Sequence, residues 1–214
     1  AIHRARLLRE GVALHEAVAG IARAWGLACT VLPMSNEPVR TMIATGDGEL
    51  AFQEYMVRLR TEADVHAIRF AGIEEARPAP GVLDAIRGAE AVILAPSNPF
   101  VSIGPILAVP GVRQALAETR AARVAISPII AGQVVKGPAA KMLASLGYEV
   151  SAPGVARLYA GLVDLFVLDD QDRELAPVIE QLGMRALVTN TMMTSMERKK
   201  ELAEEIVRAI GERR

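Results

Sequence analysis

Four short apolar runs, each followed by a polar loop and a helical pattern, constrain the fold of this chain more than any other feature of its sequence. The runs cover residues 91–95, 123–126, 165–168 and 185–188. Runs this short, bounded by turn-forming residues, are typical of buried strands. Strands that alternate with helices form a parallel sheet that the helices cover. We therefore predict an α/β, Rossmann-like three-layer fold with a mostly parallel sheet, in which the run 91–95 is a fully buried strand.

The loops after the four strands are expected to form a ligand crevice, because the carboxyl ends of parallel strands meet at one edge of the sheet. These loops carry Ser97, Ser127, Asp169 and Thr189. In the first loop, the side chains of Ser97 and Asn98 both donate and accept hydrogen bonds. Gly104 would let a ligand approach the backbone closely. The alternative is an ordinary strand-to-helix connection, and local physics alone does not separate the two.

The residues before the first of these runs predict a β-hairpin and helical insertion at 29–70. Residues 29–34 and 39–45 read as strands, the second paired with 49–52 through the turn at Gly46-Asp47-Gly48. An amphipathic helix at 53–58 and a half-buried strand at 64–70 follow. Upstream, apolar residues recur at three- and four-residue steps over 14–26, which predicts a helix with Trp25 in the core. Downstream, the helix predicted at 173–182 contains Pro177, which implies a kink or a later start.

Composition limits the classes of partner. The chain has 214 residues, 51% of them hydrophobic, which suits one α/β domain with a substantial core. A net charge of -1 favours neither nucleic acid nor an acidic membrane as a partner. A single cysteine, Cys29, fits a reducing compartment, and with no signal peptide or membrane-length apolar run we expect a cytoplasmic protein. Because the chain starts at Ala1 rather than Met, we expect further sequence upstream.

Two stretches could carry ionic chemistry. Lys136-Gly137-Pro138 leads into a helix that also contains Lys141, and a helix N-terminus beside two cations resembles an anion site. The spacing is not that of a P-loop, and a solvated lysine is the alternative. Asp169, Asp170 and Asp172 offer oxygen ligands for Mg²⁺, although acids after a strand also cap helices, as Asp172 could for a helix beginning near Arg173. Neither a zinc spacing nor a serine-nucleophile motif occurs.

Several motifs together resemble the 2-phospho-L-lactate transferase family of coenzyme F-420 biosynthesis. The longest is Pro96-Ser-Asn-Pro-Phe-Val-Ser-Ile-Gly-Pro-Ile-Leu-Ala-Val-Pro-Gly111. The others are Leu32-Pro-Met34, Pro38-Val39, Phe52-Gln-Glu-Tyr55, Ser127-Pro-Ile129, Lys136-Gly-Pro-Ala-Ala-Lys-Met142 and Gly154-Val-Ala-Arg-Leu-Tyr159. The resemblance covers nearly the whole chain. This sequence departs from the family in three respects. It lacks the family's N-terminal strand, Gly-rich loop and metal-holding aspartates. Asn190 stands where an aspartate is expected, and Gln133 replaces a small residue.

The resemblance implies a transferase. The hydroxyl of the deazaflavin Fo would attack the phosphorus of a guanosine diphosphate ester that carries a lactyl, enolpyruvyl or glyceryl group, and GMP would leave. It implies Mg²⁺ as cofactor, a homodimer, and Lys136 as the residue that contacts the diphosphate. The nucleotide-binding residues it implies are Ser97, Asn98, Ser102, Gly104, Ser127, Gly132, Gly137 and Lys141. Met34, Gln53 and Tyr55 would bind Fo, with the Tyr55 ring stacked on it.

Two other functions compete with this one. A nucleotide-sugar-binding regulator of the gluconeogenesis-factor type is similar to the same family. A non-catalytic α/β interaction domain is the third possibility. The segment Phe52-Gln-Glu-Tyr55 favours the enzyme, because a deazaflavin pocket needs a platform the size of its ring system.

Overall fold

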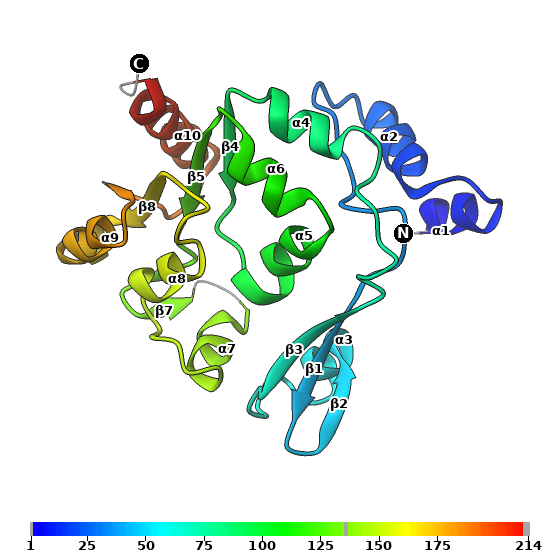
Figure 1. The fold of residues 1–214 in the computed structure, drawn as a ribbon, viewed down its shortest axis with the longest axis horizontal. Helices are drawn as coiled ribbons and strands as arrows, with labels where there is room; N and C mark the ends of the chain where they lie inside the picture. Colours follow the sequence, from blue (N-terminus) through cyan, green and yellow to red (C-terminus); the bar gives the residue numbers. More distant parts are fainter. Residues whose placement is uncertain (1, 135–136, 212–214) are drawn as a thin grey trace.

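A four-stranded parallel sheet forms the centre of the computed structural model, which describes residues 2–134 and 137–211. The strands are β4 (Ala91–Leu94), β5 (Ala122–Ile126), β8 (Leu165–Asp169) and β9 (Arg185–Thr189), in that order across the sheet (Figure 1). All three strand pairs are parallel. The α/β class and the four predicted strand–loop–helix units are therefore confirmed.

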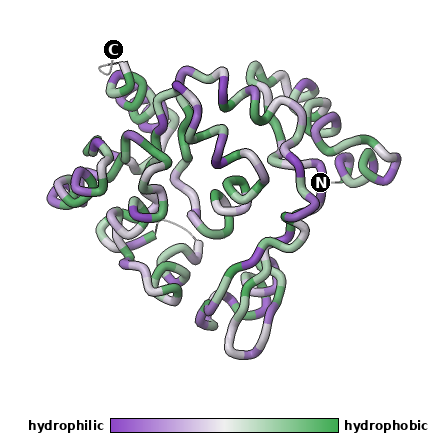
Figure 2. The backbone as a smooth tube through the Cα atoms, viewed as in Figure 1, coloured by the Kyte–Doolittle hydropathy of each residue, from purple (hydrophilic) through white to green (hydrophobic). Residues whose placement is uncertain are grey.

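Both faces of this sheet are covered. On one face, Ala125, Phe166 and Leu168 join the main core with α6 (Val112–Glu118) and α8 (Ala152–Leu158). On the other face, alternate residues such as Val124 and Val167 pack against α10 (Met196–Gly211). Figure 2 shows polar and apolar residues mixed along α10, as expected of a helix with one face on a sheet. Every residue of β8 is buried, which is the pattern of a central parallel strand.

The strand β4 differs from the prediction that it is fully buried. It pairs only with β5 and lies at the edge of the described sheet. Ile93 has 45% of its surface exposed and its neighbours in the strand are half-buried. An apolar run shows that a segment can be buried, but its place in the sheet order decides how much of it is.

A second sheet is antiparallel and projects from the body of the molecule (Figure 1). Its strands are β1 (Arg40–Thr45), β2 (Gly48–Ala51) and β3 (Ala67–Ala71), in the order β2-β1-β3. The helix α3 (Phe52–Val57) follows β2, so the predicted hairpin and helix are confirmed. Ile43, Tyr55 and Val65 form its core together with Met142 of α7 (Ala139–Ser145), which ties this sheet to the parallel one.

The N-terminal region departs from prediction at two points. The helices α1 (Ile2–Arg9) and α2 (Leu14–Ala24) form as expected, but Trp25 is 78% exposed rather than in the core. The buried face of α2 carries only the small side chains of Ala17 and Ala22. Residues 29–34 form no strand, and the neighbouring Ser35 makes only an isolated bridge to Pro78. β-propensity without an adjacent strand to pair with does not produce a sheet.

The remaining elements connect the strands and helices described above. They are α4 (Val82–Gly88), η1 (Pro99–Ile103), α5 (Gly104–Ala108), β6 (Ile129–Ile130), β7 (Gln133–Val134), η2 (Asp170–Leu175) and α9 (Ala176–Gln181). Pro177 lies in the first turn of α9. The helix predicted at 173–182 therefore has the later start, and not the kink, that the proline implied. Within the described residues, no single helix is long and apolar enough to cross a membrane. The bent pair Pro99–Ala108 and Val112–Glu118 passes that test only jointly, by length and composition.

Candidate functional site

A cavity of about 530 Å³ lies at the carboxyl ends of the parallel strands. The loops after β4, β5 and β9 and the start of α7 form its walls, together with Phe52 from α3. Its polar lining consists of the side chains of Ser97, Asn98, Ser102, Ser127, Thr191, Thr194 and Lys199. The edge of the sheet predicted to bind a ligand is therefore hollow, and its lining combines these polar side chains with apolar ones such as Phe52, Met192 and Met193.

Asn98 shapes one wall of the cavity. Its Oδ1 accepts hydrogen bonds from the amides of Phe100 at 2.9 Å and Val101 at 3.2 Å, and its Nδ2 contacts the sulfur of Met142 at 3.3 Å. These bonds start η1, a π-helical turn, which is a rare element often found at functional sites. Ser102 lies on this turn and faces the cavity. The predicted residues Ser97, Asn98 and Ser102 thus lie together.

Ser127 closes the turn after β5. Its buried Oγ donates to the carbonyl of Ile129 at 2.8 Å and accepts from the amide of the same residue at 3.1 Å. The hydroxyl is therefore engaged in the turn while the residue lines the cavity. Ser127 and Ser97 line one cavity, as expected if their two strands are parallel.

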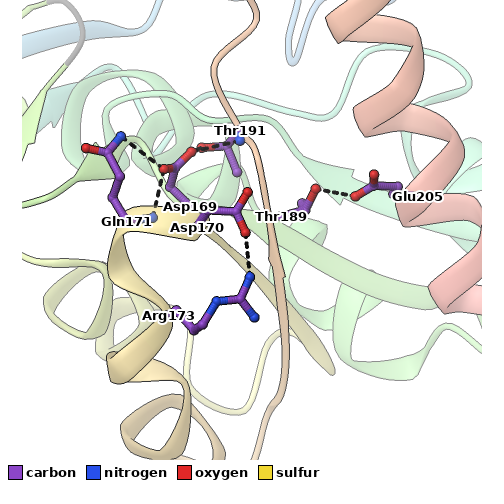
Figure 3. A network of polar contacts seen from close by, with 7 residues as sticks. All are labelled: Asp169, Asp170, Gln171, Arg173, Thr189, Thr191 and Glu205. Atoms are coloured by element: carbon purple, nitrogen blue, oxygen red, sulfur yellow. Dashed lines mark hydrogen bonds and ion pairs between the residues drawn. The ribbon is translucent and has the colours of Figure 1, made fainter.

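Asp169 anchors the loop that follows β9 (Figure 3). Its Oδ2 accepts from Thr191 twice, from the amide at 2.8 Å and from Oγ1 at 2.9 Å. Its Oδ1 accepts from the amide of Gln171 at 3.1 Å and from Nε2 of the same residue at 3.2 Å. Burial raises the pKa of Asp169, but the hydrogen bonds from Thr191 and Gln171 together lower it below its ordinary value. The buried carboxylate holds Thr191 in the cavity wall.

Asp170 and Asp172, the other two acids after β8, also make contacts within the fold. Both oxygens of buried Asp172 accept from the amide of Ala131, at 3.2 and 3.1 Å. Burial raises the pKa of Asp172, the bond from Ala131 lowers it, and the charges of Asp169 and Glu174 raise it further, so that it lies above its ordinary value. Asp170 pairs with Arg173 at 2.8 Å (Figure 3). The cap of the following turn is Asp169, not Asp172 as considered from the sequence.

These contacts bear on the expected Mg²⁺. The carboxylate oxygens of Asp169 and Asp172 already serve as acceptors within the fold. Among residues 2–134 and 137–211, no three His, Cys, Asp or Glu side chains form a group that could hold a metal ion. The described residues therefore offer no ready-made set of three such ligands, and the expected Mg²⁺ stays a prediction.

Three residues implied for nucleotide binding lie elsewhere. Lys141 pairs with Asp64, and Gly132 lies in the exposed turn between β6 and β7 at φ +72°. Gly104 packs inside the fold, where a Cβ would come within 3.1 Å of the Phe70 ring. Close packing against Phe70 therefore accounts for a glycine at this position, which lies outside the lining of the cavity. Gly137 lines the cavity, and the adjacent Lys136 lies outside the described residues.

The residues predicted to bind Fo are not brought together. Tyr55 is fully buried, and its hydroxyl donates to the carbonyls of Ala63 at 3.0 Å and Thr61 at 3.2 Å. A ring with no exposed face cannot stack on a ligand, so the predicted stacking of Tyr55 is wrong. Gln53 is exposed on α3, and Met34 packs against the main core. Neither lines the cavity.

Sequence reasoning missed several residues that do line it, and two of these differ most from the predicted set. Phe52 is the aromatic residue of the Phe52-Gln-Glu-Tyr55 motif that reaches the cavity in place of Tyr55. Lys199 enters from the first turn of α10. Its place directly after the last strand and loop was a usable signal, because the first turn of a helix that follows a parallel strand lies at the ligand edge.

Comparisons with known proteins agree with one another. A family model described as 2-phospho-L-lactate transferase CofD matches residues 1–212. A 2-phospho-L-lactate transferase of Methanosarcina mazei is 40% identical over 208 residues, which are 97% of this chain and 68% of that protein. A phosphoenolpyruvate transferase of Streptomyces griseus is 41% identical over 217 residues, covering 96% of this chain and 68% of the relative.

A solved structure, that of protein BH3568 from Bacillus halodurans, aligns with a TM-score of 0.73 at 16% identity. The alignment covers 96% of this chain and 70% of that one. This likeness concerns the fold alone. The chain spans about two thirds of the length of the curated relatives it matches.

Proposed function

The chain belongs to the 2-phospho-L-lactate transferase CofD family, a family of transferases, and from this premise we propose that it acts on a guanosine diphosphate ester and the deazaflavin Fo. A hydroxyl oxygen of Fo forms a bond to the phosphorus that carries the lactyl-type group. The bond from that phosphorus to the oxygen of GMP breaks, and the hydroxyl proton is released. The products are GMP and the phosphodiester of Fo.

The observation that carries the proposal is the cavity at the carboxyl edge of the parallel sheet. Its hydroxyl groups and Lys199, the one cation among the described lining residues, suit a phosphorylated ligand, and its volume of about 530 Å³ is within the range of small-molecule sites. Phosphoryl transfer depends on positioning and charge neutralisation more than on a protein nucleophile. Polar side chains among apolar ones in the lining of the cavity, with Lys199 at one side, are consistent with that requirement.

The acyl part of the donor is the finer part of the proposal. One relative is named for 2-phospho-L-lactate and another, of similar identity, for phosphoenolpyruvate. The proposal therefore includes lactyl, enolpyruvyl and glyceryl donors. Comparing kcat/KM for the three esters with Fo as acceptor would identify the one that this chain uses.

The proposal also includes features that rest on the resemblance: Mg²⁺, Lys136 at the diphosphate, a homodimer and a cytoplasmic location. No step is assigned to Mg²⁺, because no group of three His, Cys, Asp or Glu ligands forms among the described residues. Turnover with and without a chelator tests the metal. Lys136→Met tests the lysine: a fall of roughly 10²–10³ in kcat would indicate a transition-state contact, whereas a rise in KM alone would indicate ground-state binding.

The experiment that tests the function is a turnover assay with Fo and a guanosine diphosphate ester, read as release of GMP. We expect one GMP for each Fo consumed. A parallel titration with a UDP-sugar addresses the regulatory alternative. Binding of the UDP-sugar without turnover of Fo would contradict the proposal and favour a nucleotide-sugar-binding regulator.

A further inference from the structure

Lys199 is the only charged side chain among the described residues that line the cavity. It lies in the first turn of α10, directly after the loop 190–195 that Asp169 anchors through Thr191. Its amide donates to the carbonyl of Ser195 at 3.2 Å, so its backbone is part of the regular helix. The backbone of Lys199 is therefore held by the helix and not by a loop.

The electrostatics of α10 do not explain this lysine. A helix N-terminus carries partial positive charge, so a cation in the first turn is unfavourable there. The two neighbouring cations are compensated along the helix: Arg198 pairs with Glu201, and Lys200 lies 3.6 Å from Glu204. The corresponding positions for Lys199 hold Leu202 and Ala203. Within the part of the chain that the structure describes, Lys199 has no ion-pair partner.

We propose that Lys199 is a binding residue for the phosphate groups of the ligand. Lys199 is an exposed residue in the wall of a cavity whose other described polar side chains are neutral, so its ammonium is the charged group there that a negatively charged ligand would meet. A lysine ammonium is a compact charge with three donors, which suits phosphate oxygens. Thr194, in the preceding loop, adds a hydroxyl to the same wall. The identity of the ligand as a nucleoside diphosphate rests on the proposed function.

The test is calorimetric titration of four proteins with GDP and with guanosine. The proteins are the wild type, Lys199→Met, Lys199→Arg and the matched control Lys200→Met. Lys199→Met keeps most of the stem and deletes the charge, so the affinity for GDP should fall roughly tenfold to hundredfold, the usual effect of one charged hydrogen bond. Guanosine affinity should not change. Lys199→Arg should recover most of the loss, and Lys200→Met, one residue along the same helix but outside the cavity lining, should bind GDP as the wild type does.

Two results would overturn the inference: unchanged GDP affinity in Lys199→Met, or an equal loss in Lys200→Met, which would show only a general effect of net charge. Circular dichroism of each variant confirms that it is folded. If the wild type does not bind GDP, the proposed function fails, and the same four proteins are titrated with inorganic pyrophosphate. Pyrophosphate binding that depends on Lys199 alone would sustain the inference without that function. No pyrophosphate binding, or binding independent of Lys199, would end it.

Discussion

Trp25 lies on the surface, directly after the last residue of α2, with 78% of its area exposed. Because little apolar surface is removed from water there, Trp25→Ala should change the free energy of unfolding by no more than about 0.5 kcal/mol. A buried tryptophan would lose about 3–5 kcal/mol on the same change. Urea denaturation of the variant distinguishes the two values, and Phe166→Ala, at a fully buried position, is the control that should show the large loss.

Tyr55 is the opposite case. Its ring is fully buried and its hydroxyl donates to the carbonyls of Thr61 and Ala63. Tyr55→Phe keeps the ring and leaves these carbonyls without that donor, so it should cost about 1–3 kcal/mol of stability. Fo affinity should be unchanged in this variant, since the hydroxyl points into the core of the antiparallel sheet. A large loss of Fo affinity with normal stability would contradict the assignment of Tyr55 to the core.

These residues mark what a local sequence pattern can and cannot predict. The three- and four-residue spacing correctly predicted the helix that ends before Trp25, but which side chains it buries depends on the elements packed against it. The motif around Tyr55 was correctly recognised, yet the residue that reaches the cavity is Phe52. The glycine at 104 was read as room for a ligand, and in the structure the Phe70 ring packs against it. Each error concerns a contact between residues distant in sequence.

At the scale of elements, Asp169 and Asp172 connect β8 to two other segments and should respond to pH with opposite signs. The pKa of Asp169 is lowered in the folded protein, so its carboxylate stabilises the fold above its unfolded pKa of about 3.9, and this contribution is lost as the pH falls through the folded pKa. The pKa of Asp172 is raised, so protonation of this group favours the folded state as the pH falls.

We therefore expect Asp169→Asn to lower stability at pH 7 by about 1–3 kcal/mol, since its amide group would turn a donor toward the donors of Thr191 or Gln171. The variant should also lose less stability than the wild type as the pH falls below about 3.9. Asp172→Asn is the matched control: it keeps an acceptor for the amide of Ala131 and should lose less at pH 7. Urea midpoints at several pH values measure both. Equal pH profiles for the wild type and Asp169→Asn would contradict the assignment.

The strand–loop–helix units were predictable because each is encoded by its own short segment, and parallel order then places their loops at one edge. Two predictions failed for the same physical reason: full burial of the apolar run 91–95 and a strand at 29–34. Burial of a strand, or its existence, depends on partners supplied by other parts of the chain. The segment 29–34 pairs with no strand, and β4 pairs on one side only within the described sheet. The hairpin of β1 and β2 was predicted correctly because its partner follows two residues later.

For the whole molecule, we expect a homodimer. Large apolar side chains are exposed on α1 and just after α2, among them Ile2, Trp25 and Leu27. Exposed apolar groups of this kind often mark surfaces of association. Light scattering on a sizing column should give twice the 22.9 kDa mass of the chain at micromolar concentration. A monomer mass across the concentration range would count against the dimer.

Two residues belong both to the cavity wall and to the core of the antiparallel sheet. Phe52 and Val101 line the cavity and also pack against the cluster of Ile43, Tyr55 and Met142. A ligand that binds only when the cavity wall is folded stabilises every segment that unfolds together with that wall. The backbone amides of β1, which do not line the cavity, should therefore exchange with deuterium more slowly when GDP is bound. Protection confined to the loops after β4, β5 and β9 would show instead that the projecting sheet opens independently of the site. Slowed exchange in β1 would make this sheet a reporter of occupancy that needs neither turnover nor a label.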